Sequence, residues 1–171
     1  DVFQVGTYGI GIYEDSGNTN IKRVDSLTVR YKGHDGSFYP PSLFDSVKDN
    51  YVINIKETGN EGIATYRYGT AHKVTVKNGT CDVTGTSTGQ FLAGDTVKVT
   101  ANDAPEGYQL KGWTSDDVSV PYISVLTTSF TMPDKDVTVS AEYALRPLTV
   151  TFDTNGHGTA PSNQIVYCGE K

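Results

Sequence analysis

Short segments in which apolar and polar residues alternate recur along most of the chain. Such segments occur at residues 27–31, 73–77, 96–101 and 137–143. An apolar side chain at every second position is the period of a β-strand with one buried face, whereas helices repeat their apolar residues every three or four positions. Clusters of Gly, Asn, Asp and Ser separate these segments and are typical of turns. The pattern predicts an all-β chain.

The first 71 residues are predicted to form one β-rich domain. Its expected strands are apolar runs at 3–5, 10–13, 27–31, 51–55 and 63–68. The glycines and the asparagine at 58–62 predict a turn, so that the strands would follow one another as a meander. Only residues 42–50 could hold a helical turn, and they are too few for more. No family resemblance accompanies this region.

Residues 72–144 carry a denser set of strand and turn signals. Asn78-Gly79 follows the strand at 73–77 and predicts a hairpin, because both residues tolerate positive φ. A further turn is expected at 105–107, where proline and glycine stand at fitting offsets. These signals predict a small module of short strands and tight turns.

Five sequence blocks give this region a specific resemblance. In chain order they are VTVKNGT at 74–80, GDTVKVTA at 94–101, GYQLKGW at 107–113, FTMP at 130–133 and DVTVSAEY at 136–143. Together they resemble the divergent internalin B-type repeat found in surface proteins of Gram-positive bacteria. The resemblance implies a small β module that occurs in arrays. It also implies that Tyr108, Trp113 and Phe130 form the module's core rather than a platform for sugar rings.

One stretch departs from the family pattern. Residues 116–128 look like an insertion and contain Pro121 and Tyr122. The stretch is either a plain loop or a place where this repeat acquired contacts with a partner.

Residues 145–171 resemble the first part of a second repeat. The run LTVTFDTNG at 148–156, the Ala-Pro pair at 160–161 and QIVYCG at 164–169 are similar to the Listeria–Bacteroides repeat, a small β-grasp-like module. That family usually has a small residue at the position of Cys168. Its later strands and its helix do not follow, so a truncated unit is expected at the end of a piece of a longer protein. Two modules in tandem predict an array that forms a semi-rigid stalk.

Composition and charge exclude several classes of protein. The chain has 171 residues and 36% hydrophobic residues, which fits several small cores better than one large core. With 20 acidic and 14 basic residues, the net charge is −6. This balance disfavours nucleic acid, which needs a basic surface, and gives no attraction to anionic membranes. No apolar run approaches the roughly 20 residues that cross a bilayer, so direct membrane insertion is not expected.

The two cysteines, Cys81 and Cys168, leave two interpretations open. They are either unpaired thiols in neighbouring modules or a disulfide across units, and their spacing does not support the disulfide. No Cys-x-x-Cys pair or Cys/His cluster has the spacing of a metal site. No metal and no cofactor are therefore expected.

The residue types used in catalysis occur in settings that indicate structural roles. The candidates are the histidines His34, His72 and His157, the carboxylate pairs Glu14/Asp15 and Asp116/Asp117, and the turn at 153–158. The histidines are expected at the surface. Adjacent carboxylates on a strand point to opposite faces and do not clamp one bond. The turn lacks the ligand series and the closing glutamate of a calcium loop. No catalytic residue is predicted, and the chain is not expected to be an enzyme.

Ligand-binding residues are not identified. Some tyrosines are not assigned to the predicted core, namely Tyr13, Tyr39, Tyr66, Tyr68 and Tyr122. Asn78-Gly79-Thr80 matches the N-glycosylation pattern, although a hairpin is the simpler interpretation. Lys–Asn isopeptide cross-links occur in surface domains of this kind, and no pair of residues is assigned to one.

The sequence thus predicts tandem small β modules: a β-rich domain at 1–71, a divergent internalin B-type repeat at 72–144 and the start of a further repeat at 145–171. The expected protein is extracellular, on the cell surface or wall or secreted. Its expected role is non-catalytic and structural or adhesive, as a spacer with weak contacts to host or cell-wall protein or glycan and to neighbouring domains. The alternatives are a carbohydrate- or protein-binding module, with its site in 1–71 or 116–128, and an accessory domain of a secreted enzyme.

Overall fold

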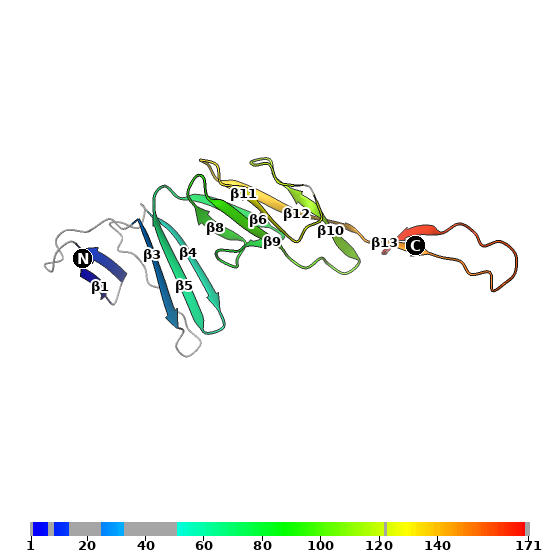
Figure 1. The fold of residues 1–171 in the computed structure, drawn as a ribbon, viewed down its shortest axis with the longest axis horizontal. Helices are drawn as coiled ribbons and strands as arrows, with labels where there is room; N and C mark the ends of the chain where they lie inside the picture. The colour runs from blue at the N-terminus through cyan, green and yellow to red at the C-terminus, as the bar shows by residue number, and fades with distance from the viewer. Residues whose placement is uncertain (1, 7–8, 14–24, 33–50, 122, 170–171) are drawn as a thin grey trace.

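The computed structural model describes residues 2–6, 9–13, 25–32, 51–121 and 123–169, and all regular structure in these residues is β-strand. The strands form several small sheets, and the chain runs from one end of an elongated molecule to the other (Figure 1). The prediction of an all-β fold is confirmed. Residues 42–50, the candidate helical turn, lie outside the described residues.

Two sheets are built from residues before position 72. The first is the antiparallel pair of β1 (Val2–Gly6) and β2 (Gly9–Tyr13). The second contains β3 (Ser26–Lys32), β4 (Tyr51–Thr58) and β5 (Glu61–Tyr68) in the order β3–β5–β4. The predicted meander is wrong, because β5 is the central strand. β4 and β5 form a tight hairpin with Gly59 at a φ of 63°, whereas residues 33–50 separate β3 from β4, so no short turn constrains these two to pair.

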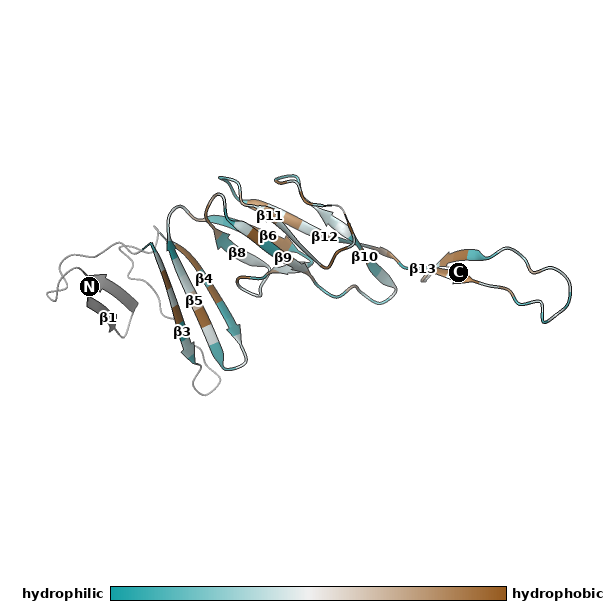
Figure 2. Ribbon diagram, viewed as in Figure 1, coloured by the Kyte–Doolittle hydropathy of each residue, from teal (hydrophilic) through white to brown (hydrophobic). Residues whose placement is uncertain are grey.

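The β3–β5–β4 sheet has one apolar and one polar face. Side chains that share a face alternate along each strand, and pairs such as Ile53–Tyr66 and Asn54–Thr65 sit opposite each other. On the apolar face, hydrophobic side chains pack around Ala64 and Tyr66, which are both fully buried. Polar and apolar positions mix along these three strands (Figure 2). The polar face includes Asn54 and Thr65, which lie opposite each other on β4 and β5.

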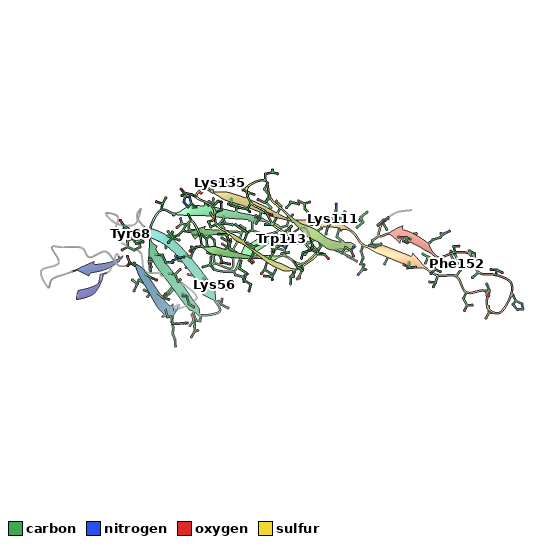
Figure 3. All side chains as sticks on the ribbon, turned by 45° about the horizontal axis from the view of Figure 1, so that its top comes forward. Lys56, Tyr68, Lys111, Trp113, Lys135 and Phe152 are labelled. Carbon is green, nitrogen blue, oxygen red and sulfur yellow. The ribbon has the colours of Figure 1, made fainter. Side chains whose placement is uncertain are left out.

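Residues 72–145 form a module of two sheets, the two-sheet module. One sheet has the order β10 (Tyr108–Thr114), β12 (Val137–Leu145), β6 (His72–Lys77) and β8 (Thr88–Phe91). The other has the order β11 (Thr127–Thr131), β9 (Thr96–Ala101) and β7 (Gly79–Cys81). The alternating residues of both sheets meet in one core, and Trp113 lies within it with none of its surface exposed (Figure 3).

The first and last strands of the module are parallel neighbours. β12 pairs with β6 from Val137 opposite Val74 to Ser140 opposite Lys77. Because both strands run in the same direction, the chain enters the module at one end of this pair and leaves it at the other. Segments before and after the module therefore lie at opposite ends of it (Figure 1).

Asn78 and Gly79 form a corner between the sheets, so the predicted hairpin is wrong. β6 pairs with β8 and β12, whereas β7 pairs with β9 in the other sheet. Asn78 has the expected positive φ, 58°, but there the chain passes from β6 in one sheet to β7 in the other. A Cβ on Gly79 would lie 2.6 Å from the backbone oxygen of Thr100, so only glycine fits this close approach.

Tyr108 is not a core residue, which corrects a third expectation. Trp113 and Phe130 are buried as predicted, but Tyr108 keeps 43% of its surface exposed. It opens β10 opposite Leu145, at the end of the sheet, and an irregularity between Leu110 and Gly112 shifts the register before Trp113. The early part of β10 therefore projects past the core.

The tail is a hairpin of β13 (Pro147–Val150) and β14 (Gln164–Tyr167). It leaves the module beside the turn at Gly107, whose carbonyl accepts a hydrogen bond from Arg146 N–H at 2.8 Å. Leu148 and Ile165 are exposed and lie on opposite faces, because they occupy neighbouring positions in the register. Phe152 lies further along the tail (Figure 3).

Candidate functional site

The β3–β5–β4 sheet meets the two-sheet module at a junction between two edge strands, β4 and β8. Side-chain amides of each strand bond backbone groups of the other. Asn54 Nδ2 donates to the Gln90 carbonyl at 2.7 Å, and Asn54 Oδ1 accepts from Gln90 N–H at 2.8 Å. Gln90 Oε1 in turn accepts from Ile53 N–H at 2.9 Å. The two side-chain amides thus replace a missing strand on each side, which keeps polar backbone groups paired where water is partly excluded.

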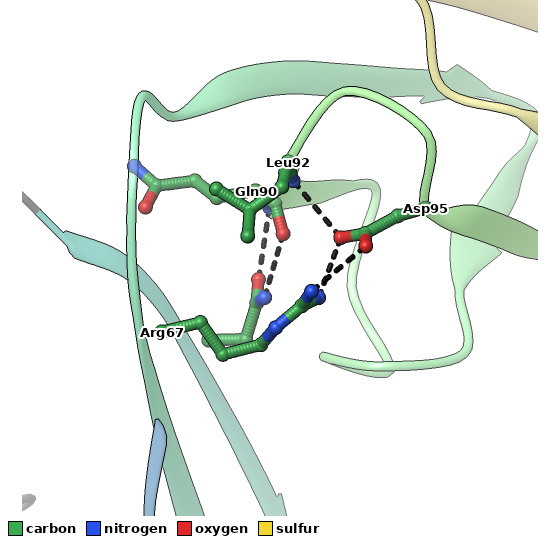
Figure 4. A network of polar contacts seen from close by, with 5 residues as sticks. Arg67, Gln90, Leu92 and Asp95 are labelled. Atoms are coloured by element: carbon green, nitrogen blue, oxygen red, sulfur yellow. Dashed lines mark hydrogen bonds and ion pairs between the residues drawn. The ribbon is translucent and has the colours of Figure 1, made fainter. Parts of the chain in front are cut away.

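An ion pair lies beside this contact (Figure 4). Arg67 on β5 holds Asp95 through two bonds, from Nη1 to Oδ2 at 2.6 Å and from Nη2 to Oδ1 at 2.9 Å, the two-pronged geometry that arginine forms with carboxylates. The backbone N–H of Leu92 also donates to Asp95, at 2.9 Å. Burial opposes ionisation of Asp95, but these donors outweigh it and lower the pKa of Asp95.

A second charged contact closes the other side of the junction. Lys56 Nζ on β4 donates to the Asp82 carbonyl at 2.7 Å. The Asp82 carboxylate pairs with Lys98 at 2.9 Å and accepts from the Thr100 hydroxyl at 2.8 Å. Burial again opposes ionisation, and the Lys98 and Thr100 donors outweigh it, so the pKa of Asp82 is lowered. The junction is therefore held at three separated points.

A groove of about 400 Å³ runs between these points. Its floor and walls come from both parts of the chain, namely Ser26, Thr28, Asn54, Thr65, Arg67, Asp82, Val83, Gln90, Phe91, Asp95, Thr96 and Lys98. We call it the junction groove. Two charged pairs, two amides and several hydroxyls face it, together with the apolar surface of Phe91 and Val83. Small-molecule sites often lie at interfaces of this kind.

The 116–128 stretch is tied to the module rather than free of it. Trp113 Nε1 donates to the Val125 carbonyl at 3.0 Å, and Ser115 Oγ donates to the Thr138 carbonyl at 2.6 Å. Asp117 accepts from Thr138 N–H and from Lys135, and these bonds lower its pKa. Beneath the first part of the stretch lies a polar hollow of about 610 Å³. Tyr122 lies outside the described residues.

The candidate catalytic and metal residues are dispersed. His72 corrects the expectation of a surface histidine, because 12% of its side chain is exposed and its Nε2 lies 2.8 Å from Asp134. His157 is exposed in the tail loop, and His34 and the Glu14/Asp15 pair lie outside the described residues. Among the residues that the structure describes, no group of three or more His, Cys, Asp and Glu side chains is placed to hold a metal ion.

The cysteines are both free thiols. Cys81 is fully buried in the module's core, and this burial, with a smaller effect of Asp82, raises the pKa of its thiol to about 12. Cys168 is half-buried in the tail and lies against Gly107, where an added Cβ would be 2.7 Å from its sulfur.

The tyrosines do not gather into a platform. Tyr66 is fully buried in the β3–β5–β4 sheet and is unavailable to a ligand. Tyr68 is 39% exposed and packs edge-to-face on Tyr51 with ring centroids 5.5 Å apart. The side chain of Tyr13 and all of Tyr39 lie outside the described residues.

Asn78 has a structural bonding pattern. Its Nδ2 donates to the Ala141 carbonyl at 3.0 Å, and its own carbonyl accepts from Asn102 N–H at 2.9 Å. The Asn-Gly-Thr sequence thus lies at the corner between the two sheets, where Asn78 Nδ2 is bonded to the Ala141 carbonyl.

Sequence reasoning missed the junction groove. Asn54 carries a weak signal, because it is a polar residue within the apolar run of β4 and is almost fully buried. Arg67, Gln90 and Asp95 carry none, since their types are common on exposed strands and turns. These residues form a site because the β3–β5–β4 sheet packs against the two-sheet module and brings them together. Their spacing along the chain does not predict this contact.

Comparison with known proteins identifies one part of the chain. Residues 72–147 match the family model of the divergent InlB B-repeat domain, which agrees with the resemblance of the two-sheet module to that repeat. No curated protein and no solved structure matches the chain. Within the described residues, no helix has the length and apolar character to span a membrane.

Proposed function

We propose, from the match of residues 72–147 to a bacterial surface-protein repeat, that this chain is a non-catalytic spacer of a cell-surface or secreted bacterial protein. In this proposal it acts outside the cell and sets the distance and orientation between the domains on either side of it. The parallel pairing of β6 and β12 supports this role, because it places entry and exit at opposite ends of the module. Each module then adds its length to the chain of modules.

The observation that carries the proposal is the junction. A spacer fixes orientation only if its joints resist bending, and the contacts of Asn54, Arg67 and Lys56 hold the β3–β5–β4 sheet to the module at three points. Rotation about one contact would break at least one of the others. Domains joined by a flexible linker lack such restraints and reorient freely.

The tail supports the idea of an array. We propose that residues 145–171 begin a further repeat, that 72–144 is one repeat and that 1–71 is a separate β-rich domain. A two-stranded hairpin is marginally stable alone in water. The exposed apolar side chains on both faces of β13 and β14, such as Leu148 and Ile165, fit strands that neighbouring parts of a repeat would cover.

Backbone ¹⁵N relaxation on the intact 171-residue chain tests the spacer proposal. We expect amides in β3, β4 and β5 to report the same anisotropic tumbling as amides in the two-sheet module, since one rigid body has one diffusion tensor. Separate correlation times for the two parts would contradict the proposal, because independently tumbling domains cannot fix orientation.

A further inference from the structure

We propose that the junction groove binds a neutral saccharide. This goes beyond the spacer role, since a chain can set a distance without binding any small molecule. The proposal depends on the charge balance of the groove, on its hydrogen-bonding groups and on the state of the strand edges around it.

The charges in the groove cancel. Arg67 faces Asp95 and Lys98 faces Asp82, at 2.6 Å and 2.9 Å respectively, so two cations meet two anions. A phosphorylated or polyanionic ligand would gain no net attraction from them. The Arg67–Asp95 pair instead presents planar donors and acceptors that are already oriented before any ligand arrives.

The lining keeps unused hydrogen-bonding capacity. The guanidinium of Arg67 has five N–H groups and uses two of them on Asp95. Among the described residues, the hydroxyls of Thr28 and Thr96 have no hydrogen-bond partner, although both face the groove. A sugar hydroxyl donates and accepts at the same time, so it can bridge a threonine and a charged group that are both within reach.

Apolar surface is available beside these polar groups. Phe91 lines the groove with its small exposed part, 7% of the residue, and Val83 lines it next to Phe91. Sugar rings present C–H groups on one side and hydroxyls around the rim, so a mixed lining of this kind suits them. A volume of about 400 Å³ falls within the range of sites for small ligands.

A peptide that adds a strand is a poorer occupant. Such binding needs free backbone groups on a strand edge. At this junction Ile53 N–H and both backbone groups of Gln90 are already bonded to side chains across the interface. The hollow beside Arg30, Lys32 and Lys56 is a poorer site for a neutral sugar, because three cations face a single carboxylate there.

The test is an NMR titration of the intact chain with a panel of neutral oligosaccharides: maltotriose, cellotriose, chitotriose and lactose. We expect at least one of them, at millimolar concentration, to shift amides of Thr28, Gln90 and Thr96 in a saturable manner. Thr28→Val and Thr96→Val remove one hydroxyl each without touching the junction bonds, and each should weaken binding about fivefold. Thr149→Val in β13, far from the groove, is the matched control and should bind as the native chain does.

Three results would overturn the proposal. The first is the absence of saturable shifts in groove amides with any member of the panel. The second is saturable binding that maps elsewhere or that survives both threonine changes. The third is binding of polygalacturonate or heparin alone, since a charged saccharide would require an unbalanced site. None of these bears on the spacer proposal, which depends on tumbling rather than on a ligand.

Discussion

The side chain of Asn54 occupies the place of a neighbouring strand beside Gln90: it donates to the Gln90 carbonyl at 2.7 Å and accepts from the Gln90 N–H at 2.8 Å. An exposed edge strand such as β8 is otherwise a template for unwanted pairing. One asparagine on a separate sheet pairs the Gln90 backbone groups on that edge and at the same time attaches the sheet to the module.

Asn54→Ala should loosen the junction. The change removes both bonds and leaves two partly buried backbone groups of Gln90 without partners, at a cost of about 1–2 kcal/mol. We expect faster hydrogen exchange of the Gln90 amide and a lower free energy of unfolding. Asn60→Ala, in the exposed β4–β5 turn, is the control and should change the free energy of unfolding by less than about 0.5 kcal/mol. Unchanged exchange at Gln90 would contradict the role assigned to Asn54.

The Arg67–Asp95 pair should make the junction sensitive to acid. Because the folded chain lowers the pKa of Asp95, the pair contributes stability above the unfolded pKa of about 3.9 and loses it as pH falls through the lower folded value. Asp95→Asn should cost about 1 kcal/mol at neutral pH, a figure discounted because 43% of the Arg67 side chain is exposed. The difference from the native chain should shrink towards zero in strong acid.

Denaturant unfolding at neutral and strongly acidic pH measures this difference. The exposed carboxylate Asp103, which lies outside the junction, provides the control as Asp103→Asn. An equal cost of Asp95→Asn at both pH values would show that the carboxylate's charge does not contribute.

Gly79→Ala should strongly destabilise the two-sheet module. The added Cβ would lie 2.6 Å from Thr100 O, and a backbone atom in the central strand β9 cannot move aside, so we expect a loss of about 2–3 kcal/mol. Trp113, the single tryptophan, reports unfolding of this module by its fluorescence. Gly94→Ala is the matched control: its φ is 87°, but open space surrounds it, so it should cost about 1 kcal/mol. Equal losses would contradict the close approach.

The two thiols should react at very different rates. Cys81 is fully buried with a pKa raised to about 12, so almost no thiolate is present at neutral pH, whereas Cys168 is half-buried in the tail. Iodoacetamide should modify one thiol per native chain and two in denaturant, and peptide mapping should place the native label on Cys168. Native labelling of Cys81 would contradict the packing of the core.

Alternation along the chain predicted much of the two-sheet module. The strands at 73–77, 96–101 and 137–143 are present as β6, β9 and β12, and Trp113 is buried as expected. Alternation reports that a strand buries one face, but it does not say which strand lies beside it. For the same reason the β3–β5–β4 order was not predicted.

Local turn chemistry was also ambiguous. Asn78-Gly79 permits positive φ at a hairpin and equally at a corner between two sheets, and the packing of β7 against β9 decides between them. Tyr108 shows a similar limit, because its exposure depends on where the core ends along β10. The junction groove forms because Asn54 contacts Gln90 and Arg67 contacts Asp95, residues that are far apart in the sequence. A pattern of neighbouring residues therefore does not predict the groove.

The parallel pair of β6 and β12 also governs how the module responds to a pulling force. Tension applied to the ends of the module acts along these two strands in opposite directions, so the hydrogen bonds between Val137–Ser140 and Val74–Lys77 are loaded together in shear. Neighbouring strands pulled from one shared end would instead unzip bond by bond. A module whose terminal strands are connected in this way therefore resists a pulling force better than one whose terminal strands unzip.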